Sequence, residues 1–459
     1  RTAGTHLLAY GPLSHGVSSS AVADQHAIIG IPSAAVDVPE SFVSNPHPDA
    51  SWFRERNFGA FIHWGISSVR AEVDLSWGMI AGTAYDLGTK ITPREYFAQA
   101  ESFRPEAYDP EGWLRAAAAA GVNHAVLTTK HHDGFALWPS AYGEFNTKNF
   151  FGGRDLVREF VDACARTGIR PGLYYSPPDW YYNRHRISFR RASDGTSENP
   201  HLGLDHEPIA LPPADPAWEA DFHAYLRGQI EELLTNYGKI DLLFFDGRPE
   251  VISMERIREL QPSILVNERM HGYGDFATPE CHVPADAPAG PWEVVDTWDM
   301  AGRWGYAMPF VNRPAAWVAE RLSLVRAMGG NYMINLAPKA DGSLPDGILH
   351  DFDWLVQWRG PAEQAFRDVA PLPAGVVSNV PAVCRGRDVY LFPPNPFYSL
   401  LQLTGVPAPE SARLLSTGAD LPHGHIPTFR DGPRLNVLLP PDMRCGGDIV
   451  QVRFAAPVA

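Results

Sequence analysis

Side chains that can perform acid–base and nucleophilic chemistry lie at the ends of short apolar runs in this sequence. The clearest case is KIDLLFFDG (239–247), which closes on Asp246 and a glycine. Other runs end in imidazole, phenol or guanidinium side chains, namely His63, His131, His132, Tyr175 and Arg269, and a second carboxylate, Glu293, stands at the start of a run. A carboxylate can act as nucleophile and a second carboxyl group as general acid and base, so this set favours a hydrolytic enzyme.

Each of these residues also has a simpler structural interpretation. Asp246 before Gly247 could be a turn residue, and His63 could be a hydrogen-bonded core histidine. The pair in KHHDGF could bind a metal ion together with His63, but adjacent residues on a strand point to opposite faces. No HxH or HExxH motif accompanies the pair, so we predict no metal and no other cofactor.

A barrel of parallel strands would gather these residues. Apolar runs alternate with amphipathic stretches, and the best helix is predicted over 217–237, where apolar residues recur every three or four positions. The predicted strands lie within 57–65, 124–130, 170–176, 239–247, 263–269, 292–298 and 331–338. Strands that alternate with helices over this length predict a (β/α)8-type barrel, whose active site is built at the C-terminal ends of the strands.

The composition divides the chain into three parts. Residues 1–45 are rich in small residues and are predicted to be a leader segment, and residues 46–362 form the barrel. After about residue 363, short strand-like pieces bounded by Pro and Gly predict a C-terminal antiparallel β-sandwich over 363–459. The segment 183–215 follows the third strand and is interpreted as a surface loop, with a lid or a subsite as the alternative.

Charge and composition exclude several functions. The net charge of −15 disfavours nucleic acid and anionic membranes as partners, and no apolar run approaches the length of a membrane span. The chain does not begin with Met, so we expect processing and predict a secreted or periplasmic location. The cysteines have no metal-binding spacing; Cys384 and Cys445 could form a disulfide. The sequence does not predict the oligomeric state.

Aromatic residues near the predicted strand ends indicate a sugar as the ligand. Trp77, Trp304, Tyr175 and several others lie there, and aromatic faces cover the apolar faces of a pyranose while carboxylates and imidazoles hold its hydroxyls. Glycoside hydrolysis needs two carboxyl groups on either side of one C–O bond, which this set supplies.

Several long motifs follow one another from about residue 50 to 345. They are WFRERNFGAFIHWG, TTKHHDGFALWPS, GIRPGLYYSPPDWY, IDLLFFDG, GDFATPE, GPWEVVDTWDMAGRWGY and GGNYMINLAPKADGSLP. In order and spacing these motifs resemble glycoside hydrolase family 29, the α-L-fucosidases. The resemblance implies an exo-acting α-L-fucosidase that retains anomeric configuration, with a fucosylated oligosaccharide or glycoconjugate as substrate. The alternatives are a glycosidase for a related L-sugar such as an α-L-galactoside, and a fucose-binding protein without catalysis.

The resemblance also implies roles for single residues. The family's nucleophile matches Asp246 and its general acid–base matches Glu293, with Glu280 as the rival acid and Asp296 as a weaker one. Sugar contacts match the residues His63, His131, His132, Tyr175, Arg269 and Trp304.

Two departures from the family concern the sugar contacts. Phe244 stands where many members have Trp two residues before the nucleophile. In AEVDLSWGMIAGTAYD, which departs from the family's Glu-Trp-Tyr segment, Trp77 is expected to replace the family Trp, and Glu72 is the candidate for the family Glu.

Overall fold

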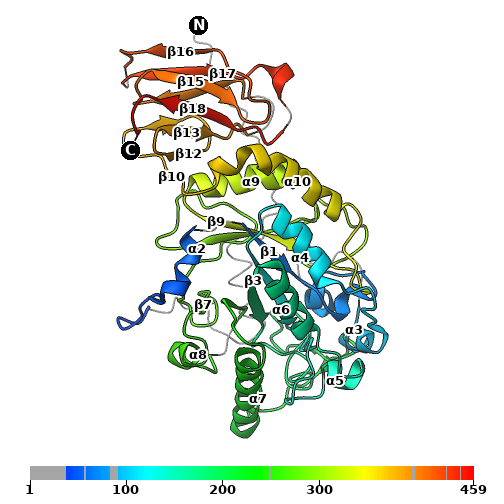
Figure 1. The fold of residues 1–459 in the computed structure, drawn as a ribbon. Coiled ribbons are helices and arrows are strands. Elements are labelled where there is room, and N and C mark those ends of the chain that lie inside the picture. The colour runs from blue at the N-terminus through cyan, green and yellow to red at the C-terminus, as the bar shows by residue number, and fades with distance from the viewer. Residues whose placement is uncertain are drawn as a thin grey trace.

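The computed structural model describes residues 38–458 except 56–57, 83–90, 248–249, 395–397, 431 and 445. Most of the predicted leader 1–45 and one half of the suggested Cys384–Cys445 pair therefore lie outside the described residues. Two bodies are visible in Figure 1, a barrel with surrounding helices and a smaller body of antiparallel strands.

Seven parallel strands form the main sheet, in the order β7-β6-β3-β2-β1-β9-β8. Each overlaps one of the seven predicted apolar runs. The strands are β1 (Phe58–Ile62), β2 (His124–Lys130), β3 (Arg170–Tyr175), β6 (Leu242–Phe245), β7 (Leu265–Val266), β8 (Glu293–Thr297) and β9 (Asn331–Leu336). Almost every residue in them is buried, as expected when helices cover the outer face and side chains fill the interior.

An eighth extended segment joins the two edges of this sheet. Phe276 bridges Asn267 just after β7, and Ala277 and Glu280 bridge Trp292 and Val295 of the β8 region, all in parallel orientation. The segment 276–280 thus occupies the gap between β7 and β8 and completes the predicted (β/α)8-type barrel. No helix flanks it between residues 268 and 292, where glycine and proline are frequent.

Helices surround the barrel. They are α2 (Trp52–Glu55), α3 (Pro93–Ala98), α4 (Pro110–Ala119), α5 (Thr147–Phe150), α6 (Leu156–Thr167), α7 (Pro216–Thr235), α8 (Met254–Leu260), α9 (Ala315–Ala327) and α10 (Ile348–Ala362). Short 3-10 turns are η1 (Pro48–Ala50), η2 (Ile66–Ser68), η3 (Leu75–Met79), η4 (Gln99–Ser102), η5 (Glu363–Ala365) and η6 (Pro441–Met443). The sequence sets the start of α7, where Pro216 follows an Asp215 cap that accepts hydrogen bonds from the amides of Ala217 and Trp218.

The interior of the barrel is an apolar column with polar residues at both ends. Phe61, Val126, Tyr174, Phe244, Phe276, Val295 and Met333 belong to one buried cluster. Because side chains alternate along a strand, residues two positions from these also point inward. This alternation places Glu293 and His124 at one end of the column, and His63, Asp246 and Glu280 at the other.

The C-terminal body consists of two antiparallel sheets that share one apolar core. One sheet contains β10 (Ala370–Pro371), β12 (Ala382–Arg385), β13 (Asp388–Leu391), β18 (Val450–Phe454) and β15 (Pro409–Leu414). The other contains β11 (Val377–Ser378), β14 (Leu400–Thr404), β17 (Arg434–Leu438) and β16 (His423–Ile426). This is the predicted sandwich architecture.

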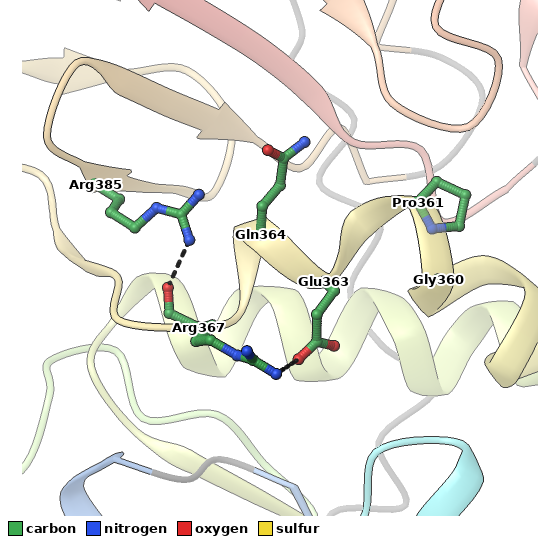
Figure 2. Close-up of a pocket in the computed structure, with 6 residues that line it drawn as sticks. All are labelled: Gly360, Pro361, Glu363, Gln364, Arg367 and Arg385. Carbon is green, nitrogen blue, oxygen red and sulfur yellow. Dashed lines mark hydrogen bonds and ion pairs between the residues drawn. The ribbon is translucent and has the colours of Figure 1, made fainter.

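The sandwich lies against α9 and α10 (Figure 1). Arg326 of α9 donates a hydrogen bond from Nη2 to the Val369 carbonyl at 2.7 Å. A hollow at this junction is lined by residues of α10, η5 and β12, where Arg385 donates to the Arg367 carbonyl and Arg367 pairs with Glu363 (Figure 2). It contains none of the predicted site residues.

The segment 183–215 lies on the surface, with many of its residues exposed, and is anchored to the barrel at a few points. It contains the short hairpin β4 (His201–Leu202) and β5 (Pro208–Ile209), and Phe189 is fully buried. His206 bonds through Nε2 to the Met79 carbonyl at 2.9 Å, and Ala81 bridges Arg190. The segment therefore supports the loop that contains η3. In the part of the chain that the structure describes, no helix is long and apolar enough to cross a membrane.

Candidate active site

Asp246 is the first residue after β6 and lies on the inward side, two positions beyond Phe244. Its Oδ2 accepts a hydrogen bond from the Tyr174 hydroxyl at 2.8 Å, and its Oδ1 lies 3.1 Å from Nη1 of Arg269. Nε2 of His132 lies 3.6 Å from Oδ2. Burial by itself raises the pKa of Asp246, but His132, Arg269 and the Tyr174 hydroxyl together hold it well below its usual range. Asp246 is therefore ionised at neutral pH.

Arg269 joins Asp246 to a second carboxyl group. Its other terminal nitrogen, Nη2, contacts Oε1 of Glu280 in a short ion pair. Both acidic side chains remain partly open to solvent, with 25% of Asp246 and 31% of Glu280 exposed. Burial raises the pKa of Glu280, and Asp246 adds to the rise while Arg269 opposes it. One guanidinium therefore holds an ionised carboxylate beside a carboxyl group that is easier to protonate.

The three predicted histidines lie around this pair of acids. His63 follows β1 and bonds through Nδ1 to Oδ1 of Asn335 at 2.7 Å. His131 and His132 follow β2, which ends at Lys130, so strand alternation no longer separates them. Each bonds through Nδ1 to a serine, His131 to Ser76 at 2.6 Å and His132 to Ser176 at 2.5 Å. Burial lowers the pKa of all three histidines.

Aromatic rings cover the histidines. The ring of Trp304 lies 4.9 Å from that of His63, and the ring of Trp77 lies 5.2 Å from that of His132 in an edge-on arrangement. Phe244 lies deeper in the barrel. Its ring stacks on that of Tyr174 with the ring centres 5.9 Å apart, and Cζ of Arg269 lies 5.7 Å from the centre of the Phe244 ring. The structure thus brings the predicted residues Trp77, Trp304 and Phe244 to the same end of the barrel.

Two buried side chains fix the loop that presents Trp304. Oδ1 of Asp74 accepts hydrogen bonds from the amides of Trp304 and Gly305 at 3.0 and 2.8 Å. Nδ2 of Asn335 donates to the Trp304 carbonyl at 2.7 Å. A Cβ at Gly305 would lie 2.7 Å from a Leu75 methyl, so the two loops pack closely there and a larger residue would displace the Leu75 side chain. Asp74, Ser76, Ser176 and Asn335 were not among the predicted site residues.

The structure corrects the prediction for Tyr175. Its hydroxyl points outside the barrel, where it donates to Gln229 of α7 at 2.9 Å and accepts from Lys130 at 3.1 Å. Tyr174, one residue earlier, points inward and contacts Asp246. Tyr174 pairs with Phe244 in register and both belong to the interior cluster, so the register shows that Tyr174 is the tyrosine of this pair that faces the site.

The structure also corrects the placement of Glu293. It is the first residue of β8, paired in register with Asn331, the first residue of β9. Its Oε1 lies 2.9 Å from Nε2 of His124, and neither side chain is more than 1% exposed. Thr297, at the site end of β8, lies four residues away, or about 13 Å along a strand. Glu293 is therefore at the closed end of the barrel, away from Asp246.

The remaining predicted carboxylates also lie outside the cluster. Asp296 points away from the interior and forms a two-bond ion pair with Arg321 of α9 at 2.7 and 3.0 Å. Glu72 is 39% exposed and pairs with Arg70. Among the predicted acids, only Asp246 and Glu280 share a partner at the C-terminal ends of the strands.

A metal ion is a weaker interpretation of this site. His131, His132 and Asp246 each have a ligand atom within 4.8 Å of the others, so they could in principle surround a cation. However, Asp246 is already paired with Arg269, whose positive charge would repel that cation. The donors and acceptors fit the hydroxyls of a sugar without this conflict.

Known proteins that are similar to this chain are α-L-fucosidases. The family model described as α-L-fucosidase matches residues 38–359. The chain belongs to the α-L-fucosidase family. It is 27% identical to the tissue α-L-fucosidase of Mus musculus and 28% to that of Homo sapiens, each over 331 residues. These alignments cover 66% of this chain and 67% and 65% of the two relatives, so they span about two thirds of each protein.

Solved α-L-fucosidases share the fold over most of their length. Isoenzyme 1 from Paenibacillus thiaminolyticus has a TM-score of 0.69 at 26% identity, with 88% of this chain and 98% of that one covered. A family 29 α-L-fucosidase from Bacteroides thetaiotaomicron has a TM-score of 0.69 at 23% identity, covering 91% and 98% of the two chains. The likeness therefore extends beyond the barrel into the C-terminal sandwich.

Proposed function

We propose that this protein is an exo-acting α-L-fucosidase that removes terminal α-L-fucosyl residues from oligosaccharides or glycoconjugates with retention of configuration. The observation that carries the proposal is the bridge from Arg269 to Asp246 and Glu280. It places two carboxyl groups of different acidity at the open end of a barrel lined by histidine and aromatic side chains. Family membership supports the sugar, and the carboxyl pair supports the chemistry.

In the first step, Asp246 is the nucleophile and Glu280 is the acid. A carboxylate oxygen of Asp246 attacks the anomeric carbon as the glycosidic C–O bond breaks, and protonated Glu280 gives its proton to the departing oxygen. The products are a free aglycone and a fucosyl ester of Asp246. The low pKa of Asp246 keeps it ionised for attack, and the raised pKa of Glu280 favours its protonated form.

In the second step, the roles reverse for Glu280. The ionised Glu280 takes a proton from a water molecule, and the water oxygen attacks the anomeric carbon from the side that the aglycone left. The ester bond breaks, Asp246 is released as a carboxylate, and Glu280 regains its proton. Two inversions give net retention, which needs carboxyl groups about 5–5.5 Å apart.

The direct test is NMR of the first product formed from an aryl α-L-fucoside. We expect α-L-fucose first, followed by mutarotation to the mixture. A first-formed β anomer would contradict the double displacement. Assays on the matching α-L-galactoside and calorimetric titration with fucose run alongside. Faster cleavage of the galactoside would favour that sugar, and binding without turnover would favour a binding protein.

A further inference from the structure

The neighbours of two site histidines determine which ring nitrogen carries the proton. His63 and His132 each use Nδ1 to bond a neutral side chain, Asn335 and Ser176 respectively. Neutral imidazole has one N–H donor and one unprotonated acceptor nitrogen, so the nature of the Nδ1 partner decides what Nε2 can do. In both cases that partner has further bonds that fix its own orientation.

Asn335 can only accept a hydrogen bond from His63. Its Nδ2 donates to the Trp304 carbonyl at 2.7 Å, so the amide oxygen is the atom that faces His63 at 2.7 Å. An amide oxygen has no hydrogen to give, and Nδ1 of His63 must therefore hold the proton. Burial lowers the pKa of His63 to about 4, so the ring is neutral at neutral pH and its Nε2 has a free lone pair.

Ser176 imposes the same tautomer on His132. Its hydroxyl oxygen lies 3.0 Å from the Pro178 carbonyl, which only accepts, so the single hydroxyl hydrogen lies on that bond. Nδ1 of His132 must then donate to Ser176, which leaves Nε2 unprotonated. That Nε2 lies 3.6 Å from Oδ2 of Asp246, which is also an acceptor. Nε2 of His132 and Oδ2 of Asp246 therefore cannot bond each other, and both are available to accept a hydrogen bond from a donor group such as a sugar hydroxyl.

We infer that Asn335 and Ser176 are positioning residues that set His63 and His132 as hydrogen-bond acceptors toward the substrate, so that the site recognises the hydrogens of free sugar hydroxyls. This inference rests on the proposed function for the identity of the sugar. The ligand class is a pyranoside whose hydroxyls at these contacts are unsubstituted, because an O-acetyl, O-methyl or O-sulfate group has no hydrogen to donate. Among the residues that the structure describes, Ser76 has no comparable second bond that would fix the tautomer of His131.

NMR of the imidazole nitrogens tests the tautomers without turnover. The full chain labelled with 15N-histidine is observed at neutral pH, and His63→Gln and His132→Gln identify the two signals. We expect the Nδ1–H tautomer for both rings. An Nε2–H tautomer or a doubly protonated ring at either position would overturn the inference. Because no hydrolysis is involved, this result is independent of the proposed activity.

The Ser176→Ala variant tests whether the serine acts through His132. Without the hydroxyl, His132 is free to place its proton on Nε2 and bond Asp246. We expect that change of tautomer in the spectrum and a rise in KM of about tenfold. Ser140→Ala is the matched control, because Ser140 is also buried but bonds Glu232 of α7 outside the barrel. An unchanged His132 tautomer in Ser176→Ala would contradict the inference.

Analogues of L-fucose test the same point on the unaltered protein. Each hydroxyl is replaced in turn by hydrogen or by fluorine, which cannot donate, and the inhibition constant is measured. For the hydroxyls that contact His63 and His132, we expect fluorine to weaken binding as much as hydrogen does, by about tenfold or more. Retention of affinity by every fluorinated analogue would overturn the inference. Sugar binding with this pattern but no hydrolysis would instead reject only the proposed function.

Discussion

The two ends of the barrel contain similar groups in opposite surroundings. At the closed end, Glu293 pairs with His124, both are buried, and the rings of Trp52 and Phe53 lie 5.2 and 6.2 Å from the His124 ring. At the open end, Asp246 and Glu280 share Arg269 and keep about a quarter to a third of their side chains exposed. Both pairs point into the same apolar column.

This difference shows that inward orientation alone does not make a carboxylate catalytic. A substrate and a water molecule must reach the group, and in a parallel barrel only the C-terminal strand ends offer that access. Glu293 lies at the opposite end of β8, four residues before Thr297 at the C-terminal end of the strand. At the closed end, Glu293 and His124 form a buried carboxyl–imidazole contact that belongs to the packing of the fold, whereas the pair at the open end is available for chemistry.

The substitution Asp246→Asn should have the largest effect, because it removes the nucleophile from the open end. We expect kcat on an aryl α-L-fucoside to fall by at least the ~10²–10⁴-fold that is typical of losing an acid–base group. Circular dichroism and thermal unfolding verify that the fold is intact. A folded variant with most of its activity would remove Asp246 from the mechanism.

Tyr174 and Tyr175 sharpen the comparison at the level of adjacent residues. Tyr174→Phe removes a hydrogen bond to a charged group, worth about 1.5–3 kcal/mol, so kcat/KM should fall roughly 10- to 150-fold. Tyr175→Phe removes the same hydroxyl on the outer face, where it bonds Lys130 and Gln229. It should lower the unfolding free energy and leave kcat/KM within about twofold. Equal losses of kcat/KM in the two variants would contradict the assignment.

The free energy of unfolding should depend on pH because of His63, a buried histidine at the open end of the barrel. Burial lowers the pKa of His63 from 6.5 to about 4, so between these values the unfolded chain binds more protons than the folded one. The stabilisation is fully present above pH 6.5 and is lost as the pH falls toward 4.

Urea unfolding at pH 7.5 and 5.0 measures this loss. The linkage relation gives a loss of about 2 kcal/mol for the wild type that is absent in His63→Gln. The two proteins are compared at each pH under the same salt concentration. The same loss in both would show that His63 is not responsible.

The smallest expected effect concerns Asp74, which holds the Trp304 loop over the open end. Asp74→Ala leaves two amides without an acceptor, and we expect KM to rise about tenfold with a smaller change in kcat. Asp74→Asn keeps an acceptor oxygen and should retain most of the affinity.

Asp275→Ala is the matched control for Asp74→Ala. Asp275 is also a buried carboxylate that accepts from two backbone amides, those of Asn45 and Val266, but it does not contact Trp304. Asp275→Ala should lower stability without raising KM. A KM effect of equal size in Asp275→Ala would mean that the Asp74→Ala effect is a general loss of stability.

Apolar periodicity predicts the barrel well, because buried parallel strands and their helices leave long regular patterns. Each of the seven predicted strand regions contains a strand, and the predicted helix 217–237 corresponds to α7. The closing segment 276–280 leaves no such pattern. It has only a few bridges, lies between glycine and proline residues, and has no helix beside it.

The site could be predicted to the level of the strand end but not of the single residue. Tyr174 and Tyr175 end the same apolar run, and only the register with Phe244 shows which of the two points inward. The family resemblance predicts Glu293 as the acid–base group, although this residue stands at the start of its strand, which is the closed end of the barrel. Asn335 and Ser176 bond the histidines across more than 40 residues of sequence, and only the folded chain shows such contacts.

The central claim, that the open end holds the acid–base group, is tested most directly by comparing Glu280→Gln with Glu293→Gln on aryl α-L-fucosides of graded leaving-group acidity. We predict that Glu280→Gln loses about 10²–10⁴-fold in kcat/KM on the poorest leaving group and much less on an activated phenol, which needs little protonation. Glu293→Gln should be less stable than the wild type. In its folded fraction, the ratio of kcat/KM between poor and good leaving groups should equal that of the wild type. A leaving-group dependence in Glu293→Gln, with none in Glu280→Gln, would contradict the account.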